Sequence, residues 1–563
     1  MKPRHCLFLL LAALTVARLV LAASYELSSD EAYYYLWSQH PDLSYFSKGP
    51  GVAFAIRAST ALFGPTEFGV RFLSPLLALG TSLIVFHFAR RLYNERVAIW
   101  TVLLLNALPI FNVGAIVMTI DPLSIFLWAA SVYTFWLALE KSPAFSWWWP
   151  LTGLLIGLGF LAKYTNAMEL LSILLLLVFT RRYRRDLLGP GFWSMLVIAL
   201  ACTIPVIVWN SQHAWITLVH LSARGGLNTG FAIRPRAFLQ FLGKQCGVYS
   251  PLVFIGLIWS LWWAGQRAGT QFKPRFLGAF AVPLLVMYAS LAIKSPGEPN
   301  WTAPAFVTLG ILGVALWLEK IAERPILGRL AIAALLLALA MTTVALDTDI
   351  LRVVGIPFPY AYDTSGQFHG WQTSADAVQQ FRHEFEREAG HPVFLIANKY
   401  QTASSLAFYM TDHRVEGPGH PPVYLPESQD IESEFSFWPR YDEFVTPPPG
   451  AAPADAYYTE EQGVNLFQGR DALFITDESR TGAERPPSPI QRGFDRVELV
   501  RLFRIERRGL PLRDLRIFAC YNYRPLSVDV DPIRRPSLSL SHLNLHLNLN
   551  FSAPPAPSLK RPE

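Results

Sequence analysis

The feature that most constrains the fold is a succession of long apolar runs over the first 346 residues. A helix that crosses a bilayer needs about 20 mostly apolar residues. Runs of this kind lie near residues 7–23, 73–90, 97–117, 121–139, 149–164, 166–180, 191–209, 247–264, 276–293, 302–318 and 326–345. Hydrophobic residues make up 52% of the chain and charged residues only 16%, which is typical of membrane proteins. The sequence therefore predicts a polytopic α-helical membrane protein with about eleven transmembrane helices.

Basic residues cluster in every second connection between these runs. The clusters are Lys2 and Arg4; Arg90, Arg91 and Arg96; Lys141; Arg181, Arg182, Arg184 and Arg185; Arg267, Lys273 and Arg275; and Lys320, Arg324 and Arg329. Because basic loops stay on the cytoplasmic side, this pattern predicts a cytoplasmic N-terminus and places the intervening connections outside. The net charge of +6 then reflects topology, and no nucleic-acid partner is predicted.

Residues 1–24 allow an alternative, because they also have the basic start and small-residue end of a cleaved signal peptide. Residue 30 lies outside the cytoplasm under either interpretation. Whether the first 23 residues are retained stays open.

The composition changes near residue 347, where acids, bases and prolines become interspersed. We expect residues 1–346 to form the membrane domain and 347–525 a soluble extracytoplasmic α+β domain. Strands are predicted near 392–397, 471–476 and 515–521, and a helix over 403–409. Residues 526–563 are rich in Pro and Ser and are predicted to be a flexible tail.

An acidic pair, Asp30 and Glu31, follows the first apolar run and is itself followed by aromatic residues. Carboxylates at a bilayer edge are expensive to desolvate, so they usually line a wet cavity and serve a function. The rest of this first outer loop, about residues 24–72, and the other outward connections also carry polar or aromatic residues. These include Tyr45, Lys48, Arg71, Asp121, Lys163, Tyr164, His213, Arg224, Glu298 and Asn300.

Each of these residues also has an ordinary structural explanation. Asp121 before Pro122 has the pattern of a helix N-cap. Lys163 can extend its amine from a helix end to the interface, and Asn300 before Trp301 fits a cap beside an interfacial aromatic. All of these ordinary explanations would have to apply at once to residues on the outer side of the membrane, while the connections on the cytoplasmic side carry only basic clusters. A shared functional site is therefore favoured.

Carboxylates and fixed cations at a membrane edge suit transfer of a group from a lipid phosphate. An acid can act as general base towards an acceptor hydroxyl or amine. Lysine and arginine can hold a phosphate or pyrophosphate leaving group and neutralise its developing charge. The residues therefore predict glycosyl transfer from a lipid-linked phosphate, and they leave ion or solute transport open.

Six motifs in order carry a family resemblance. They are Asp30-Glu31-Ala32-Tyr33-Tyr34, Tyr45-Phe46-Ser47-Lys48-Gly49-Pro50, Thr119-Ile120-Asp121-Pro122, Gly159-Phe160-Leu161-Ala162-Lys163-Tyr164-Thr165, Trp209-Asn210-Ser211-Gln212-His213 and Glu298-Pro299-Asn300-Trp301. Over residues 5–320 the chain resembles bacterial membrane glycosyltransferases of the GT-C fold. More narrowly, it is similar to the family 39 and aminoarabinose-transferase-like proteins, which are related to the dolichyl-phosphate-mannose protein mannosyltransferases.

The resemblance implies inverting transfer from a polyprenyl-phosphate sugar to a lipid, glycan or protein acceptor, outside the bacterial cytoplasmic membrane. By motif position, Asp30 is the expected catalytic base or acceptor-orienting acid, Asp121 the second functional acid and Glu31 a secondary candidate. The expected ligands of the donor phosphate are Lys48, Lys163 and Arg224. The candidates for the substrate pocket are Tyr33, Tyr34, Tyr45, Tyr164, Glu298 and Asn300.

The chain departs from its relatives in one motif, because Lys48-Gly49-Pro50 stands where many of them have two prolines or His-Pro-Pro. This leaves the shape of the loop and the exact donor open. Some relatives bind a divalent metal near the site. Here the four cysteines are widely spaced and no metal-ligand set is evident, so neither a metal nor another cofactor is predicted.

Two other classes of protein remain as alternatives. A transporter or flippase of lipid-linked sugars tends to carry internal repeats and polar or broken helices at mid-membrane. Here no repeat is visible and polar residues concentrate at one edge, which favours the enzyme. A non-catalytic envelope protein would bind partners through its soluble domain, and it predicts that Asp30 and Asp121 are replaceable.

Overall fold

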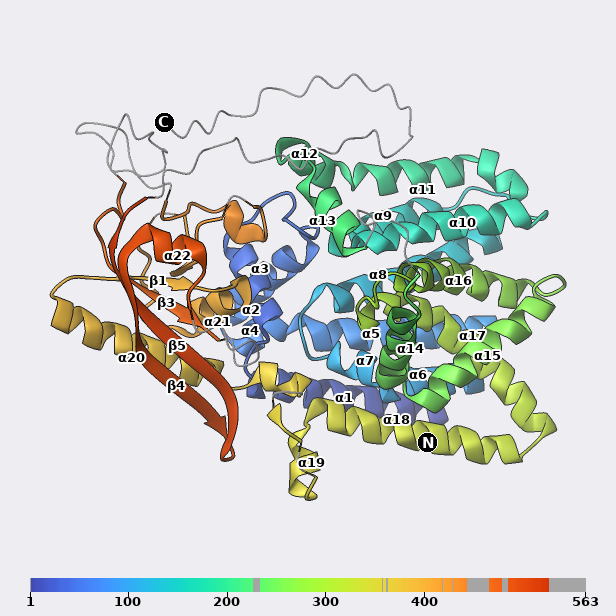
Figure 1. Ribbon diagram of the computed structural model, residues 1–563. Helices are drawn as coiled ribbons and strands as arrows, with labels where there is room; N and C mark the ends of the chain where they lie inside the picture. The colour runs from blue at the N-terminus through green and yellow to red at the C-terminus, as the bar shows by residue number, and fades with distance from the viewer. Residues whose placement is uncertain are drawn as a thin grey trace. The chain divides into compact units, whose positions relative to one another are not determined.

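The computed structural model describes residues 2–225, 233–356, 358–360, 363–417, 419–428, 430–442, 465–477 and 485–525. The chain forms two compact units, and each is built from separate stretches of sequence (Figure 1). The first unit comprises Met1–Tyr25, Pro41–Trp209 and His220–Pro357. The second comprises Glu26–His40, Asn210–Val219 and Phe358–Glu563. The stretch with the acidic pair therefore belongs to the same unit as the C-terminal region.

The first unit is helical (Figure 1). Its elements up to residue 188 are α1 (Pro3–Ser24), α3 (Gly51–Phe63), α4 (Glu67–Arg71), α5 (Leu73–Leu92), α6 (Glu95–Ala107), α7 (Pro109–Val113), α8 (Ile120–Lys141), α9 (Trp148–Ala162), η1 (Tyr164–Ala167), α10 (Met168–Phe179) and η2 (Arg184–Leu188). The later ones are α11 (Pro190–Ala201), α14 (Pro235–Tyr249), α15 (Pro251–Arg267), α16 (Phe272–Ala292), η3 (Pro299–Thr302), α17 (Ala303–Glu323), α18 (Ile326–Leu346) and α19 (Asp349–Val353). Helices α12 (Ile204–Gln212) and α13 (Ile216–Arg224) contribute residues to both units.

Seven helical segments of the described chain are long and apolar enough to cross a membrane. They are Pro3–Ser24, Glu67–Leu92, Ile120–Lys141, Pro190–Gln212, Phe272–Ala292, Pro299–Glu323 and Ile326–Leu346. The pair Pro235–Tyr249 and Pro251–Arg267 is bent by 108° and makes an eighth segment if it counts as one span. The shorter apolar helices are Gly51–Phe63, Trp148–Ala162 and Tyr164–Phe179. The protein is thus a multi-pass membrane protein, but the predicted count of eleven spans is not confirmed.

The run predicted near 97–117 illustrates why the count differs. Helix α6 ends at Ala107 because Pro109 follows two residues later, and the residue before a proline is disfavoured in helical geometry. The almost fully buried Arg18 of α1 serves the polar groups near this break. Its Nη2 donates to Oδ1 of Asn106 at 2.9 Å and to Oδ1 of Asn112 at 2.7 Å. An apolar run long enough to span the membrane can therefore contain a helix break whose polar side chains are paired by a residue of another helix.

Helix α8 is the central helix of the first unit. It packs against α5, α9 and α17, and most of its side chains are buried. Thr119 caps its N-terminus by accepting the N–H of Asp121 at 3.3 Å. Asp121 is therefore not the N-cap, and its side chain is available for other partners.

The second unit contains a five-stranded sheet in the order β2-β1-β3-β5-β4 (Figure 1). Its strands are β1 (Phe394–Ala397), β2 (Val423–Tyr424), β3 (Ala472–Thr476), β4 (Phe494–Arg507) and β5 (Leu510–Tyr523). β1 is parallel to β2 and β3, whereas β5 is antiparallel to β3 and β4. Its helices are α2 (Ser29–Gln39), η5 (Thr364–Phe368), α20 (Trp371–Ala389), α21 (Tyr400–Tyr409), η6 (Glu434–Ser436) and α22 (Ser488–Gly493).

The predicted α+β character of this region is confirmed. The three predicted strands appear as β1, β3 and β5, and the predicted helix appears as α21. Strand β4 and helix α20 were not predicted, because both carry many charged residues on an exposed face. The tail predicted at 526–563 lies outside the described residues.

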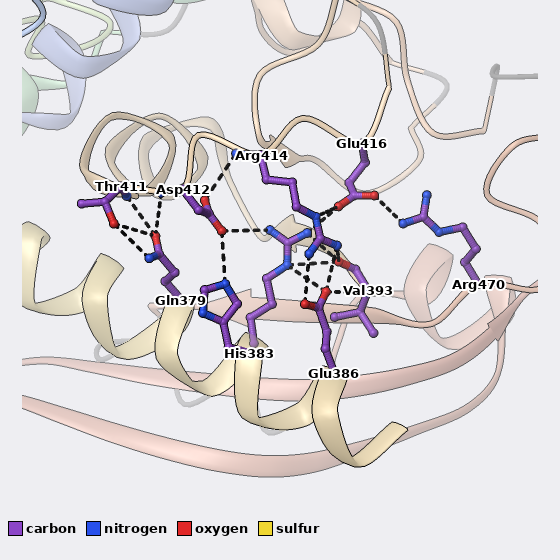
Figure 2. Close-up of polar contacts among 10 residues, drawn as sticks. Gln379, His383, Glu386, Val393, Thr411, Asp412, Arg414, Glu416 and Arg470 are labelled. Atoms are coloured by element: carbon purple, nitrogen blue, oxygen red, sulfur yellow. Dashed lines mark hydrogen bonds and ion pairs between the residues drawn. The ribbon is translucent and has the colours of Figure 1, made fainter. Parts of the chain in front are cut away.

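A network of charged side chains ties α20 to the start of β1 and to residues 411–416 (Figure 2). The fully buried Arg382 donates to the carbonyl of Val393 from Nε at 3.1 Å and from Nη2 at 2.7 Å, and to Glu416 at 2.5 Å. Arg414 donates to both oxygens of Glu386, at 2.8 and 3.0 Å. Bidentate charge-assisted bonds of this kind fix geometry, so the network holds helix and sheet together.

Candidate functional site

Asp121, in the first turn of α8, lies at the centre of the site in the first unit. Its Oδ1 accepts a hydrogen bond from Nζ of Lys163 at 2.7 Å, and its Oδ2 accepts one from Nδ2 of Asn300 at 2.5 Å. Asp121 is 8% exposed and Lys163 is 6% exposed. An ion pair out of contact with water is maintained only when geometry and additional hydrogen bonds are good, and Asn300 supplies such a bond. Three predicted site residues thus converge.

Lys163 is placed beside Asp121 by a break between two helices. It follows the end of α9 in an extended conformation, and η1 begins at the next residue. Asn166 of η1 is clamped to α8, because Ser124 Oγ donates to its Oδ1 at 2.5 Å and its Nδ2 donates to the carbonyl of Ser124 at 3.1 Å. A Cβ at Gly159 would come within 2.5 Å of Nδ2 of Asn166, so this close packing requires glycine.

The Lys48 loop packs directly on the end of α9. A Cβ at Gly49 would lie 2.3 Å from the carbonyl oxygen of Leu161, which is closer than any side chain can approach. The carbonyl of Lys48 accepts the N–H of Tyr45 at 3.0 Å, which closes the loop. Gly49 is therefore what lets the loop reach the residues just before Lys163.

The two predicted pocket tyrosines of this region support the loop. Tyr45 is fully buried, and its hydroxyl accepts the N–H of Asp42 at 3.2 Å. The hydroxyl of Tyr164 and the hydroxyl of Ser44 share a hydrogen bond of 3.1 Å. The carboxylate of Asp42 in turn accepts a hydrogen bond from the indole of Trp209 at 2.8 Å. Tyr45 is thus a structural residue of the loop, and Tyr164 links η1 to it.

Arg224 brings a second cation to the site. It is near enough to Lys163 to act on it electrostatically, and its guanidinium lies 5.5 Å from the centre of the Trp301 ring. Its Nη2 is 3.8 Å from Oε1 of Glu298. The side chain remains 42% exposed, so Arg224 keeps a face towards an incoming ligand.

His220 joins the same group and was not predicted. Its ring lies 4.6 Å from that of Phe46. Burial, and then the charges of Lys48 and Arg224, lower the pKa of His220 to about 4. The imidazole is therefore neutral at neutral pH, and all three predicted phosphate ligands lie in one region. The spacing of His220 four residues before Arg224 on a helix was the signal available in the sequence.

The segment that carries Glu298 and Asn300 is fastened to α14. Gln245 Nε2 donates to the carbonyl of Pro299 at 3.3 Å, and Gln245 Oε1 accepts from the hydroxyl of Thr302 at 2.7 Å. Lys244 lies 4.0 Å from Glu298 and was also not predicted. These bonds hold Asn300 at Asp121, whereas the half-exposed Glu298 stays at the rim between Lys244 and Arg224.

An apolar groove of about 570 Å³ lies on the same unit. It is formed by α14, α15 and α16, and its walls include Phe241, Phe254, Trp259 and Leu285. Gln245 lines it and also holds the segment that carries Asn300. Gln245 of α14 therefore connects the groove with the segment that holds Asn300 at Asp121.

Asp30 and Glu31 form part of the second unit, in the first turn of α2. Glu31 is fully buried and completes a capping box: its Oε2 accepts the N–H of Ser28 at 2.9 Å, and its own N–H donates to Ser28 Oγ at 3.3 Å. Asp30 is exposed, and the positive end of the helix dipole favours its negative charge. Glu31 thus has a clear role in starting the helix that carries Asp30.

Tyr33 and Tyr34 anchor α2 within the second unit. The hydroxyl of Tyr33 accepts the N–H of Glu434 at 2.6 Å, and its ring lies 4.5 Å from that of Tyr400 at the start of α21. Tyr34 is also buried and stacks on Tyr33. These two pocket candidates, with Asp30 and Glu31, form a group of their own, whereas the other predicted residues gather in the first unit.

The described part of the chain contains no group of three or more His, Cys, Asp or Glu side chains that could hold a metal ion. The expectation of a metal-free site stays a prediction.

Three comparisons connect this geometry with known proteins. Residues 47–209 match the family described as dolichyl-phosphate-mannose-protein mannosyltransferase. The lipid A galacturonosyltransferase RgtD of Rhizobium johnstonii is 28% identical over 325 residues, which are 56% of this chain and 66% of the relative. The undecaprenyl phosphate-alpha-4-amino-4-deoxy-L-arabinose arabinosyl transferase of Pseudomonas aeruginosa is 31% identical over 284 residues, which are 48% of this chain and 49% of the relative. The chain thus spans between about half and 66% of the length of these curated relatives.

Solved structures identify the fold. The crystal structure of ArnT from Cupriavidus metallidurans in the apo state superposes with a TM-score of 0.57 at 17% identity, covering 91% of this chain and 97% of ArnT. The structure of the same protein bound to undecaprenyl phosphate gives 0.57 at 18% identity with the same coverage. The predicted GT-C fold is thereby confirmed, and the chain has the fold of ArnT.

Proposed function

We propose that this protein is a membrane glycosyltransferase that moves a sugar from a polyprenyl-phosphate donor to a lipid, glycan or protein acceptor. The observation that carries the proposal is the ion pair of Lys163 with Asp121, together with the cations Arg224 and Lys48 around His220, on the unit that also carries the apolar groove. A cluster of cations matches the phosphate of the donor, and the groove matches its apolar tail.

The cations serve the leaving group in this proposal. The acceptor oxygen or nitrogen attacks the anomeric carbon, the bond from that carbon to the phosphate oxygen breaks, and its electron pair leaves with the polyprenyl phosphate. Lys163, Lys48 and Arg224 neutralise the negative charge that develops there. Lys163 is fixed in advance by Asp121, so little reorganisation is needed when the phosphate arrives.

The two aspartates take different roles. Both carboxylate oxygens of Asp121 already accept hydrogen bonds, so Asp121 orients Lys163 and Asn300 and is a poor candidate for the base. Asp30 is the candidate base by its motif position, and it receives the proton of the acceptor. Glu31 is reassigned to capping the helix that carries Asp30.

The nature of the substrates is supported by the relatives. Undecaprenyl phosphate is named for the arabinosyl transferase and was bound to ArnT, which supports a bacterial polyprenyl-phosphate donor. The name of RgtD supports lipid A as the acceptor, ahead of a glycan or a protein. The alternation of basic clusters supports a location in the bacterial cytoplasmic membrane with the N-terminus inside and the C-terminal domain outside.

A transfer assay tests the proposal. The purified full-length protein in lipid nanodiscs is given a panel of undecaprenyl-phosphate sugars with lipid A, and transfer is followed by mass spectrometry. We expect one donor to be used, we expect Asp30→Asn to abolish transfer, and we expect Lys163→Met to leave only a small residual rate. Glu319→Gln, near the other end of α17 from Asn300, is the matched control and should leave transfer unchanged. Full transfer by both Asp30→Asn and Lys163→Met would overturn the assignment.

A further inference from the structure

Two stripes of mostly polar residues start at the Asp121–Lys163 pair and face each other along their helices. One runs along α8 at positions 121, 124, 128 and 131, a spacing of three and four residues that keeps side chains on one face of a helix. The other runs from the end of α9 through η1 into α10 at positions 163, 166, 169 and 172. Residue 131 lies about 15 Å along the helix from residue 121, at 1.5 Å per residue. The stripes therefore lead from the site into the interior of the first unit.

The stripes are joined by three successive contacts, which we call the polar ladder. The first is the Lys163–Asp121 ion pair, and the second is the two-way clamp between Ser124 and Asn166. The third joins Ser131 Oγ to Oε2 of Glu169. Glu169 is fully buried, lies in a predicted apolar run and was not singled out in the sequence.

The hydrogen bonds of Ser131 indicate the protonation state of Glu169. Ser131 has a single hydroxyl proton but contacts two oxygens, the backbone carbonyl of Trp128 at 2.8 Å and the carboxyl of Glu169. A backbone carbonyl only accepts, so the hydroxyl proton goes to Trp128 and Glu169 must donate. No cation among the described residues pairs with Glu169, and a lone buried carboxylate would be very costly. A neutral carboxylic acid satisfies both conditions.

Three buried polar atoms of the two stripes have no hydrogen-bond partner among the described residues. They are Oε1 of Glu169, Nε1 of Trp128 and Oγ of Ser172. An internal water molecule makes about three hydrogen bonds to such groups. The indole N–H can only donate, which suits the oxygen of a water and not a cation.

We propose that Glu169 is a neutral positioning residue that, together with one internal water, closes the lower end of the polar ladder and fixes Lys163 for the proposed transfer. This inference depends on the proposed function for its effect on transfer. Lys163 lies at a helix break, so no continuous helix fixes its position along the axis of α8. The contacts of Asn166 and Glu169 with α8 fix that position instead.

Two substitutions of Glu169 separate its charge from its hydrogen bonding. Glu169→Gln retains a donor for Ser131 and an oxygen for the water, so transfer should stay close to that of the wild type. Glu169→Leu removes both, and we expect kcat to fall roughly tenfold to a hundredfold, as for a misplaced catalytic group, while KM for the acceptor changes little. Equal loss of transfer in both variants would show that a charge is required and would overturn the proposal.

A double substitution tests whether Glu169 acts through Lys163. If it does, Lys163→Met with Glu169→Leu should transfer no more slowly than Lys163→Met alone, because interacting residues are not additive. Lys163→Met is to be compared by its residual rate in single turnovers with excess enzyme. A further multiplicative loss in the double variant would show that Glu169 acts independently of Lys163.

Infrared difference spectroscopy provides a readout that does not depend on transfer. The carbonyl stretch of a protonated carboxylic acid should be present in the wild type at neutral pH and missing from Glu169→Gln. If it is missing from both, Glu169 is ionised and the inference fails. If the band is present but the wild type transfers no sugar from any donor, the proposed function fails while the neutral state of Glu169 stands.

Discussion

Asp121 and Lys163 form an ion pair with 2.7 Å between Oδ1 and Nζ, and both side chains are almost completely buried. They are far apart in sequence and meet because the break after α9 turns Lys163 towards the first turn of α8. Within a membrane unit the pair keeps a cation in place before any phosphate arrives. It also makes each partner dependent on the other.

Removing one partner should therefore cost more than removing both. Asp121→Asn leaves the charge of Lys163 buried without a counter-ion, and breaking a buried pair in this way costs about 3–5 kcal/mol. We expect a clear drop in the thermal unfolding temperature of the purified protein and loss of transfer. Asp121→Asn combined with Lys163→Met should recover stability but not transfer. A double variant as unstable as the sum of the single variants would contradict the pairing.

Gly49→Ala should weaken binding of the donor and change kcat little. The added methyl would lie 2.3 Å from the carbonyl oxygen of Leu161, so the Lys48 loop must move away from α9. We expect KM for the polyprenyl-phosphate donor to rise. Gly243→Ala in α14 is the matched control, because its methyl would enter open space, and steady-state kinetics should show no change for it. Equal kinetics for the two variants would show that the loop tolerates displacement.

The sequence predicted which residue types belong to the site better than it predicted their partners. Charge topology put Asp121, Lys163, Arg224 and Asn300 on one face, and the structure brings them together. No local pattern could show that both oxygens of Asp121 are occupied, because the donors come from η3 and from the end of α9.

Other misses had a signal that was available. Ser28 followed three residues later by Glu31 is the signature of a capping box, a structural role that the sequence offered beside the secondary catalytic candidacy of Glu31. Pro109 marked the end of α6 inside a run taken as a span. By contrast, the grouping of residues 26–40 with the C-terminal region depends on long-range packing, such as that of Tyr33 on Tyr400, which no periodicity reports.

The capping role of Glu31 can be separated from catalysis by one pair of substitutions. Glu31→Gln keeps the capping box, because glutamine can accept the N–H of Ser28, so transfer and stability should both be close to those of the wild type. Glu31→Ala should lower the unfolding free energy of the second unit by about 1 kcal/mol. Loss of transfer in Glu31→Gln at unchanged thermal stability would restore a catalytic role for this residue.

Arg224 and Glu298 should affect binding of the donor and not stability. Their charges are 3.8 Å apart and both side chains are more than two-fifths exposed, so the pair contributes at most about 1 kcal/mol to folding. Arg224→Gln should raise KM for the donor, whereas Glu298→Gln, which frees Arg224 and Lys244 from a competing carboxylate, should lower it. Both constants are measured by steady-state kinetics at low ionic strength. A rise in KM for both variants would show that Glu298 holds the cations in their binding position.

Acid should weaken the second unit through its buried glutamates (Figure 2). Burial acts to raise the pKa of Glu416, but hydrogen bonds and charges from Arg470, Arg414 and Arg382 outweigh it and lower the pKa. Because the folded pKa lies below the unfolded one, this contribution to stability is present at neutral pH and is lost as the pH falls below about 4.5. Glu416→Gln should lower stability at pH 7 and reduce the further loss of stability as the pH falls below about 4.5.

The buried thiol of Cys520 in β5 offers a local probe of this change. In a variant without Cys6, Cys202 and Cys246, the urea concentration at which dithiodipyridine labels Cys520 reports unfolding of the sheet at each pH. We expect this midpoint to fall with pH in the wild type and to change less in Glu416→Gln. Glu388→Gln, on the exposed face of α20, is the control and should follow the wild type. The same acid dependence in Glu416→Gln as in the wild type would mean that other carboxylates govern the stability of the sheet.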